Sequence, residues 1–171
     1  MAPESPRVIA HLRNQHCSVV VAVGSGAPFI AYLGAALGEG ELPAELFHRE
    51  IDLEDSLNGV KVCATIILEQ SGCVVVTAKC MNTGSTPFDL DALTITVPIS
   101  GECTDLLTLG GRHGMEAMEH HHTWERSHVV IENRSGRTSH ENLGVVFAAS
   151  KGYSEDRGDV CGVHLAWSGN F

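Results

Sequence analysis

The sequence predicts an all-β protein, built as an antiparallel β-sandwich of two packed sheets. Short apolar runs follow one another along the chain, separated by clusters of Gly, Asn, Pro and Ser that form turns. Two of these runs, Val60–Leu68 and Leu93–Val97, alternate in character from one residue to the next, as half-buried strands do. Helical stretches between the strands, which a βαβ fold needs, are not apparent.

The first third of the chain contains three predicted strands. They are Val8–Leu12, Ser18–Val23 and Pro28–Leu33, with a turn at Gly24-Ser25-Gly26 before the third. The next segment, Gly34 to Leu46, is acidic and interrupted by Gly and Pro. We expect a loop or a short helix there, and its run Ala35-Ala36-Leu37 is the only part that favours a helix.

A hairpin is predicted in the middle of the chain. Asn58-Gly59 is a strong turn dipeptide, and Val60–Leu68 follows it. A second turn at Gln70-Ser71-Gly72 leads into the partner strand Cys73–Cys80. After a turn at Asn82 to Pro87, Leu93–Val97 is predicted as a further strand, which Pro98 ends because proline cannot donate to the ladder.

The last third combines a predicted loop with late strands. Gly110 to Glu125 is rich in Gly, His and Glu and shows little periodicity, which predicts a long surface loop. The predicted strands are His128–Glu132, Leu143–Ala149 and Val160–Trp167, and Lys151 to Gly158 is a charged hairpin loop. On the final strand Val163, Leu165 and Trp167 should face the core, and His164 should face outward.

Length and charge limit the classes of function. A chain of 171 residues is expected to form one domain over residues 1–171, and a domain of this size buries about 70% of its unfolded surface. With 11 Lys and Arg against 21 Asp and Glu, the net charge is 11 − 21 = −10. This charge, with no basic cluster, argues against binding to nucleic acid or to an anionic membrane surface.

The cysteines and the amino terminus favour the cytoplasm. Met1 to Pro6 lacks the basic and apolar regions of a secretory signal, and the apolar run Val19 to Val23 is too short to span a bilayer. The six cysteines contain no CxxC pair. We expect reduced core cysteines in a cytoplasmic protein; a disulfide framework is the alternative.

Two segments near the carboxyl end resemble motifs of glycoside hydrolase family 36, the microbial α-galactosidases. Residues 132–140 read ENRSGRTSH and resemble the family pattern E-x-R-R-G-x-S/T-S/G/A-H. Residues 158–170 read GDVCGVHLAWSGN and resemble G-E/D-V-Y/W-G-x-x-x-x-W/Y-S-G-N. The passages from Asn82 to Leu93 and from Leu106 to Arg112 are also similar to the family. The likeness is good from about residue 60 onward and loose before it.

The resemblance implies a specific architecture and role. The region is similar to the family's N-terminal β-supersandwich, a galactose-mutarotase-like fold that packs on a (β/α)8 barrel. That barrel carries the two catalytic aspartates, so we expect no catalytic residue within residues 1–171. The positions that match the motifs imply a structural role or a role at the active-site entrance; they are Arg112, Glu116, Glu132, Gly136, Arg137, Ser139, His140, Trp167, Ser168, Gly169 and Asn170.

The chain departs from the family pattern after the leucine-rich strand. The family usually has Gly-Arg-Trp-x-Arg-Glu-Arg there, and only Arg112 and Glu116 match it. His113 replaces the Trp, and Met115 and Ala117 replace the two other Arg residues.

The histidine-rich segment suggests a metal site, but an alternative is simpler. His120, His121 and His122, with Glu119 and His113, offer ligands suited to Zn or Ni. Consecutive residues on a strand point to opposite faces and cannot all reach one ion. A surface segment without bound metal is therefore preferred, and we expect no cofactor.

Other candidate sites also have simpler explanations. The acidic pairs Glu54/Asp55 and Glu155/Asp156 are adjacent in turn-like contexts, whereas retaining glycosidases need two carboxyl groups about 5 Å apart across the scissile bond. Ser139-His140 lacks a third member and is not predicted as a nucleophile and base. Arg137 and His140 are predicted to hydrogen-bond and fix a loop. Trp167 can stack on a sugar, but its alternation with Val163 and Leu165 favours a place in the core.

Three functions therefore remain open. The first is the non-catalytic part of an α-galactosidase that shapes the entrance and the homo-oligomer and meets α-galactosides only in the full-length enzyme. The second is a stand-alone carbohydrate-binding module, which needs exposed aromatic residues, although aromatics make up only 5% of the chain. The third is a His-rich metal-binding domain, which needs His113 to converge with His120–His122.

Overall fold

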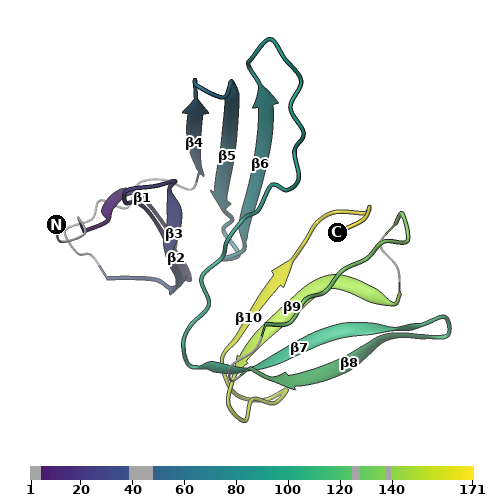
Figure 1. Cartoon of the computed structure of the whole chain (residues 1–171). Coiled ribbons are helices and arrows are strands. Elements are labelled where there is room, and N and C mark those ends of the chain that lie inside the picture. The colour runs from purple at the N-terminus through teal and green to yellow at the C-terminus, as the bar shows by residue number, and fades with distance from the viewer. Residues whose placement is uncertain (1–4, 39–47, 125–127, 138–139) are drawn as a thin grey trace. The chain divides into compact units, whose positions relative to one another are not determined.

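The computed structural model describes residues 5–38, 48–124, 128–137 and 140–171, and in these residues it contains ten strands and no helix. The strands are β1 (Arg7–Arg13), β2 (Cys17–Val23), β3 (Phe29–Ala35), β4 (His48–Asp55), β5 (Val60–Leu68), β6 (Val74–Asn82), β7 (Cys103–Arg112), β8 (Met115–Thr123), β9 (Asn142–Ser150) and β10 (Val160–His164). They form three antiparallel sheets, labelled by strand in Figure 1. The predicted all-β antiparallel fold is confirmed.

The chain divides into two compact units. The first, Met1–Pro98, contains the sheets β1-β2-β3 and β4-β5-β6, and the second, Ile99–Phe171, contains the sheet β10-β9-β7-β8. The expectation that residues 1–171 act as one domain stays a prediction. The described residues include no helix that is long and apolar enough to cross a membrane.

The first sheet confirms the three strands predicted near the amino terminus. The turn between β1 and β2 is built by Asn14, whose Oδ1 accepts the backbone N–H groups of His16 and Cys17, both at 2.8 Å. An Asn side chain that mimics a backbone turn in this way is a common reason for Asn at such positions. The segment Ala35-Ala36-Leu37 is not helical, because β3 continues through Ala35. Most of the predicted loop Gly34 to Leu46 lies outside the described residues.

The second sheet contains the predicted hairpin and one strand that the sequence did not indicate. β5 pairs with β6 from Val60 opposite Asn82 to Leu68 opposite Val74, as expected from the alternation along β5. Gly59, with φ +65°, supplies the left-handed turn before β5. A Cβ on Gly59 would also meet the Gly84 backbone at 2.8 Å. The additional strand β4 pairs along the other edge of β5.

Asp55 closes the turn between β4 and β5. Its Oδ1 accepts the backbone N–H groups of Leu57 and Asn58, both at 3.1 Å, and its Oδ2 accepts from Asn58 Nδ2 at 2.6 Å. The hydrogen bonds from the Asn58 side chain and backbone lower the pKa of Asp55 below its usual value. Glu54 and Asp55 are therefore the last two residues of β4, and Asp55 caps the turn that follows them.

We expect Asp55→Ala to lower stability at neutral pH and to lose this effect in acid. A carboxyl group whose pKa is lower in the folded state stabilises the protein above its unfolded pKa, near 4. That contribution disappears as the pH falls through the folded pKa. Urea unfolding of the variant and parent at pH 7 and at successively lower pH measures it. The neighbouring Glu54→Ala is the control, and a difference for Asp55→Ala that does not shrink in acid would contradict the assignment.

The core of the first unit joins its two sheets. Leu12 pairs with Val19, and both side chains are fully buried on one face of β1 and β2. Ile66 and Leu68 of β5 belong to the same cluster and are at most 3% exposed. The sheets β1-β2-β3 and β4-β5-β6 thus pack through the side chains that the sequence pattern predicted to be apolar faces.

Strand β2 is buried on both faces, which fits its almost continuous apolar sequence. On the face opposite the main core, Ser18 is fully buried and its Oγ lies 3.1 Å from His11 Nε2. The same Oγ accepts the Leu37 backbone N–H at 3.0 Å. This polar pair satisfies a backbone donor that a purely apolar strand would leave without a partner.

The sheet of the second unit has the order β10-β9-β7-β8, so β10 and β8 are its edges. The predicted strand Leu143–Ala149 lies within β9, and the last strand ends at His164 rather than Trp167. On one face of β7, Leu106 and Thr108 are at most 8% exposed, and fully buried Ala148 lies opposite Leu106 on β9.

Three sequence predictions are wrong in this region. Residues 110–124, the described part of the predicted surface loop, are not a loop, because β7 runs to Arg112 and β8 continues from Met115 to Thr123. Every residue of β8 is exposed, so its side chains carry no apolar alternation for the sequence to reveal. Conversely, Leu93–Val97 and residues 128–132 have strand-like sequences but form no strand. A strand also needs a neighbouring backbone, and neither segment pairs with one in the described part of the chain.

All six cysteines are free, as predicted, but the expected core position is wrong for Cys73, which is exposed, and only Cys17 is fully in the core. Cys17 is buried in β2, while Cys63 and Cys80 are half-buried in β5 and β6. Cys63 Sγ donates to Asp52 Oδ1 at 2.6 Å, and Lys61 Nζ pairs with Asp52 Oδ2 at 3.0 Å. Both hydrogen bonds lower the pKa of Asp52, and the bond from Cys63 has the larger effect.

Candidate functional site

One end of the four-stranded sheet gathers the residues that the two sequence motifs single out. β9 begins at Asn142, which lies opposite Gly110 near the end of β7. β10 ends at His164, opposite Val145 of β9, and β8 begins at Met115, opposite Arg112. Because neighbouring strands run in opposite directions, the starts of β8 and β9 and the ends of β7 and β10 lie at the same end of the sheet. We call it the motif end, made of residues 112–116, 132–137, 140–142 and 165–171.

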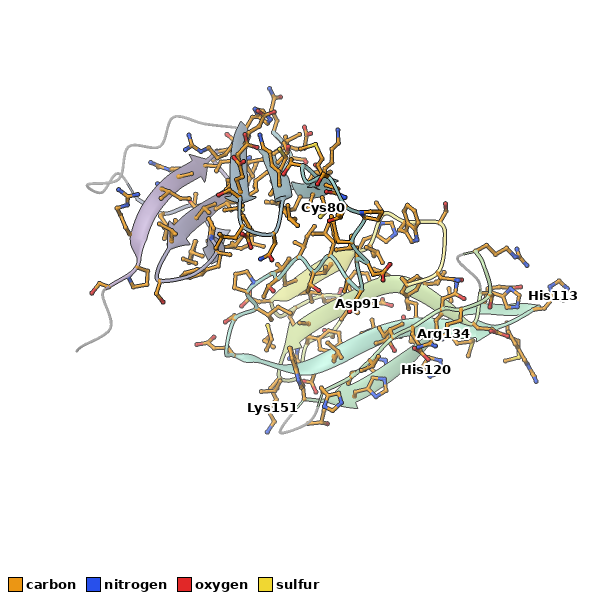
Figure 2. All side chains as sticks on the ribbon, turned by 45° about the horizontal axis from the view of Figure 1, so that its top comes forward. Cys80, Asp91, His113, His120, Arg134 and Lys151 are labelled. Carbon is orange, nitrogen blue, oxygen red and sulfur yellow. The ribbon has the colours of Figure 1, made fainter. Side chains whose placement is uncertain are left out.

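Figure 2 shows the same arrangement from the side chains. His113 and Arg134 lie toward this end of the sheet, and Lys151, which follows β9, lies at the opposite end.

Direct hydrogen bonds join the two motif segments, although they are about thirty residues apart in the chain. The backbone N–H of Asn133 donates to Phe171 O at 2.8 Å, and Phe171 N–H donates back to Asn133 O at 2.9 Å. Gly136 N–H donates to Asn170 Oδ1 at 2.6 Å. Asn142 Nδ2 also donates to Glu132 O at 3.0 Å, which attaches the first segment to β9.

Asn133 shapes the loop of the first motif. It is only 4% exposed. Its Oδ1 accepts Ser135 N–H at 2.9 Å, and its Nδ2 donates to Arg137 O. Gly136 has φ +78°, a left-handed conformation that suits glycine. The run Asn-x-Ser-Gly is a recognisable sequence signal for such a turn, although the role of Asn133 was not predicted.

Trp167 is not in the core, which corrects the prediction. The residue is 60% exposed, and Leu165 is 47% exposed, whereas Val163 is half-buried. The reason is that the strand ends before them. Leu165 N–H still bonds Gly144 O at 2.7 Å, but Trp167 N–H bonds Leu165 O at 2.8 Å, which turns the chain. After His164, successive side chains therefore no longer alternate between the two faces of the sheet.

The Trp167 ring has a defined position despite its exposure. Its Nε1 donates to Asn170 O at 2.9 Å. A Cβ on Gly169 would approach the ring nitrogen to 2.7 Å, so only glycine allows the backbone to lie this close to the indole. The Trp-Ser-Gly-Asn segment, including exposed Ser168, is thus a compact turn closed around the ring.

The tip of the β7–β8 hairpin holds the second group of motif residues. Glu116 Oε1 accepts Gly114 N–H at 2.7 Å, and this backbone bond is the main reason that the pKa of Glu116 is lowered. His113 Nδ1 lies 3.9 Å from Glu116 Oε1. The His113 ring meets the His140 ring edge-on, with centroids 6.1 Å apart. Arg112, the remaining matched residue, directs its Nη2 to Met115 Sδ at 3.3 Å.

His140 does not form its predicted pair. Both Arg137 and His140 are described, and no hydrogen bond joins their side chains; Arg137 contributes its carbonyl to Asn133 instead. His140 lies against the hairpin tip because Gly111 N–H bonds Glu141 O at 3.2 Å. Ser139 lies outside the described residues.

The histidines of β8 divide between the two faces of the sheet. Thr108 lies opposite His120, and Leu106 lies opposite His122, so these two histidines share the face of the sheet that carries Leu106 and Thr108. His121 lies on the other face, between Glu119 Oε2 at 3.3 Å and Tyr153 OH at 3.0 Å. Among the described residues no group of three or more His, Cys, Asp or Glu side chains is placed to hold a metal ion.

The surface of the motif end is hollowed by an open depression. The residues that line it are Val130, Ile131, Glu132, Asn133, Arg134, Asn170 and Phe171. Arg134 Nη2 and Nε approach Glu132 Oε2 at 3.0 and 3.2 Å. The Glu132 and Arg134 side chains are 55% and 80% exposed, so this ion pair contributes little to stability.

Comparison with known proteins identifies the family. The model of the glycosyl hydrolase family 36 N-terminal domain matches residues 9–171. An α-galactosidase of Escherichia coli is 32% identical over 117 residues. These cover 68% of this chain but only 16% of the relative, so the chain corresponds to a small part of that protein's length. No solved structure matches. The match to nearly the whole chain shows that it belongs to glycosyl hydrolase family 36, as that family's N-terminal domain.

Proposed function

We propose that the chain serves α-galactoside hydrolysis as a non-catalytic part of an α-galactosidase. The observation that carries the proposal is the family match over residues 9–171. The name of the Escherichia coli relative supplies the substrate class, terminal α-galactosides. The catalytic carboxyl groups belong, in this proposal, to a barrel that the N-terminal domain supports.

The motif end is the part of the chain that we assign to the active-site entrance. Its two loops are tied by Gly136 and Asn170, and the hairpin tip carries Glu116 next to His140. The acidic side chains there already have structural partners, Gly114 for Glu116 and Arg134 for Glu132. This favours a positioning role over acid–base chemistry.

Two measurements test the proposal. The 171-residue chain should not hydrolyse a chromogenic α-galactoside, and turnover by highly purified chain would contradict the non-catalytic role. In a full-length enzyme that carries this chain, Asn170→Ala should lower kcat/KM several-fold, because it releases Gly136 from the second motif segment. Leu57→Ala, at a residue 97% exposed in the first unit, is the control. An Asn170→Ala enzyme with unchanged kcat/KM would contradict the entrance role.

We further propose that the protein works in the cytoplasm as a homo-oligomer. Six free cysteines support a reducing compartment. Exposed apolar side chains such as Leu165 and Val160 support association of the second unit with other protein surface. Sedimentation of the full-length enzyme tests the oligomer, and a strictly monomeric enzyme at high concentration would contradict it.

A further inference from the structure

The depression at the motif end has the polar groups of a ligand site. Glu132 uses only Oε2 in its ion pair, and Arg134 uses only Nε and Nη2. Asn170 uses its Oδ1 and its carbonyl, for Gly136 and Trp167. In the described part of the chain, Glu132 Oε1, Arg134 Nη1 and Asn170 Nδ2 have no hydrogen-bond partner. Residues that line one hollow thus keep one acceptor and two donors that make no bond to the described residues.

The charges of the depression favour a neutral ligand. Glu132 and Arg134 form an ion pair at 3.0 Å, so their charges largely cancel. The chain as a whole has a net charge of −10, which disfavours an anionic ligand. A neutral molecule with several hydroxyl groups suits such a site, because hydroxyls both donate and accept hydrogen bonds.

An exposed aromatic ring is hydrogen-bonded to one of these residues. The Trp167 indole is held by Asn170 O and by close contact with the Gly169 backbone, and the residue is nevertheless 60% exposed. The bond to Asn170 connects the ring to the residue that lines the depression. A large exposed aromatic ring with a fixed orientation costs little conformational entropy when a ligand stacks on it.

We propose that the motif end is an accessory carbohydrate site, which binds a terminal galactose on the Trp167 ring and the Glu132, Arg134 and Asn170 side chains. Galactose has an axial 4-hydroxyl, which leaves the hydrogens of C3, C4 and C5 as an apolar patch on one face. That patch stacks on the indole, while the hydroxyls reach the carboxylate, guanidinium and amide. The choice of galactose among sugars rests on the proposed function; the stacking site itself rests on the geometry. Because the depression is open, the affinity is millimolar.

The two tryptophans of the chain allow a direct test. Trp124 and Trp167 are its only Trp residues, so Trp124→Phe leaves Trp167 as the single reporter and Trp167→Phe leaves Trp124. Each variant of the 171-residue chain is titrated with methyl α-D-galactopyranoside, and with methyl α-D-glucopyranoside, which differs only at C4. We expect a saturable change of Trp167 fluorescence in the millimolar range with the galactoside and a much weaker one with the glucoside. The Trp167→Phe chain should show no change.

Variants of the polar groups complete the test. Arg134→Ala and Glu132→Ala, each in the Trp124→Phe background, should weaken binding about tenfold, as expected for a lost hydrogen bond to a charged group. Lys151→Ala, at the opposite end of the sheet, is the matched control and should bind as its parent does. Circular dichroism verifies that each variant is folded. An unresponsive Trp167, an equal response to both sugars, or unchanged binding in both polar variants would overturn the inference.

This test is independent of turnover. A chain that fails to bind galactoside leaves the proposed support of a catalytic barrel intact. Conversely, sugar binding by the chain would stand even if the full-length enzyme proved insensitive to Asn170→Ala.

Discussion

Leu12→Ala should lower the free energy of unfolding by about 2–5 kcal/mol. The Leu12 side chain is fully buried, and it belongs to the cluster in which β1 and β2 meet Ile66 and Leu68 of β5. Truncation removes apolar contacts and leaves a cavity between two sheets that can collapse only partly. A loss of this size is a large fraction of the stability of a typical domain. Thermal and urea unfolding followed by circular dichroism measure it.

Two variants bracket this result. Leu57 is 97% exposed in the turn before β5, so Leu57→Ala should change stability by less than about 0.5 kcal/mol. Leu12→Met keeps most of the volume and should cost less than about 1.5 kcal/mol. If Leu12→Ala were as stable as the parent, the sheets β1-β2-β3 and β4-β5-β6 would not share the core described above.

Gly111→Ala should destabilise the second unit by about 2–5 kcal/mol, the sum of backbone strain and steric overlap. Gly111 has φ +149°, and a Cβ there would lie 2.1 Å from Met115 O. The register of β7 and β8 shifts between Gly110 and Arg112, so this glycine forms the irregularity that closes the hairpin. Moving it displaces Glu116 and the hairpin tip from His140. Differential scanning calorimetry of the variant measures the change.

Other glycines separate the two causes. Gly114 has φ +77° and open space around it, so Gly114→Ala carries backbone strain alone and should cost about 1 kcal/mol. Gly101 has neither a strained φ nor a close neighbour, so Gly101→Ala should be nearly neutral. Equal stability of the Gly111 and Gly101 variants would show that the hairpin does not need its glycine.

The sequence predicted strands well where side chains decide the structure. Val60–Leu68 alternates because one face of β5 packs on β1 and β2, and its predicted bounds agree with the structure. The same reasoning failed for Leu93–Val97, where the alternation is real but no backbone among the described residues completes a ladder. For β8 the error was the opposite one, because a strand was missed. Backbone hydrogen bonds to β7 hold β8 in place, although all of its side chains are exposed.

The two motifs were visible in the sequence, but their relation to each other was not. Matching residues 132–140 and 158–170 to a family required no structure. Their contact depends on pairs such as Asn133 with Phe171 and Gly136 with Asn170, which are far apart in the chain. No local pattern encodes such pairs, because they depend on the pairing of β9 with β10. That pairing places the segment before β9 and the segment after β10 at the same end of the sheet.

For this protein the sequence alone determined the all-β class, the family and most strands, because these follow from the spacing of apolar side chains and from local motifs. Only the tertiary structure decided that Trp167 is exposed, that residues 115–123 form the strand β8, and that Glu132, Arg134 and Asn170 line one depression. Burial and convergence depend on where a strand ends and on which strand lies beside it. Those are properties of backbone pairing between distant segments, and the order of side chains along one segment does not contain them.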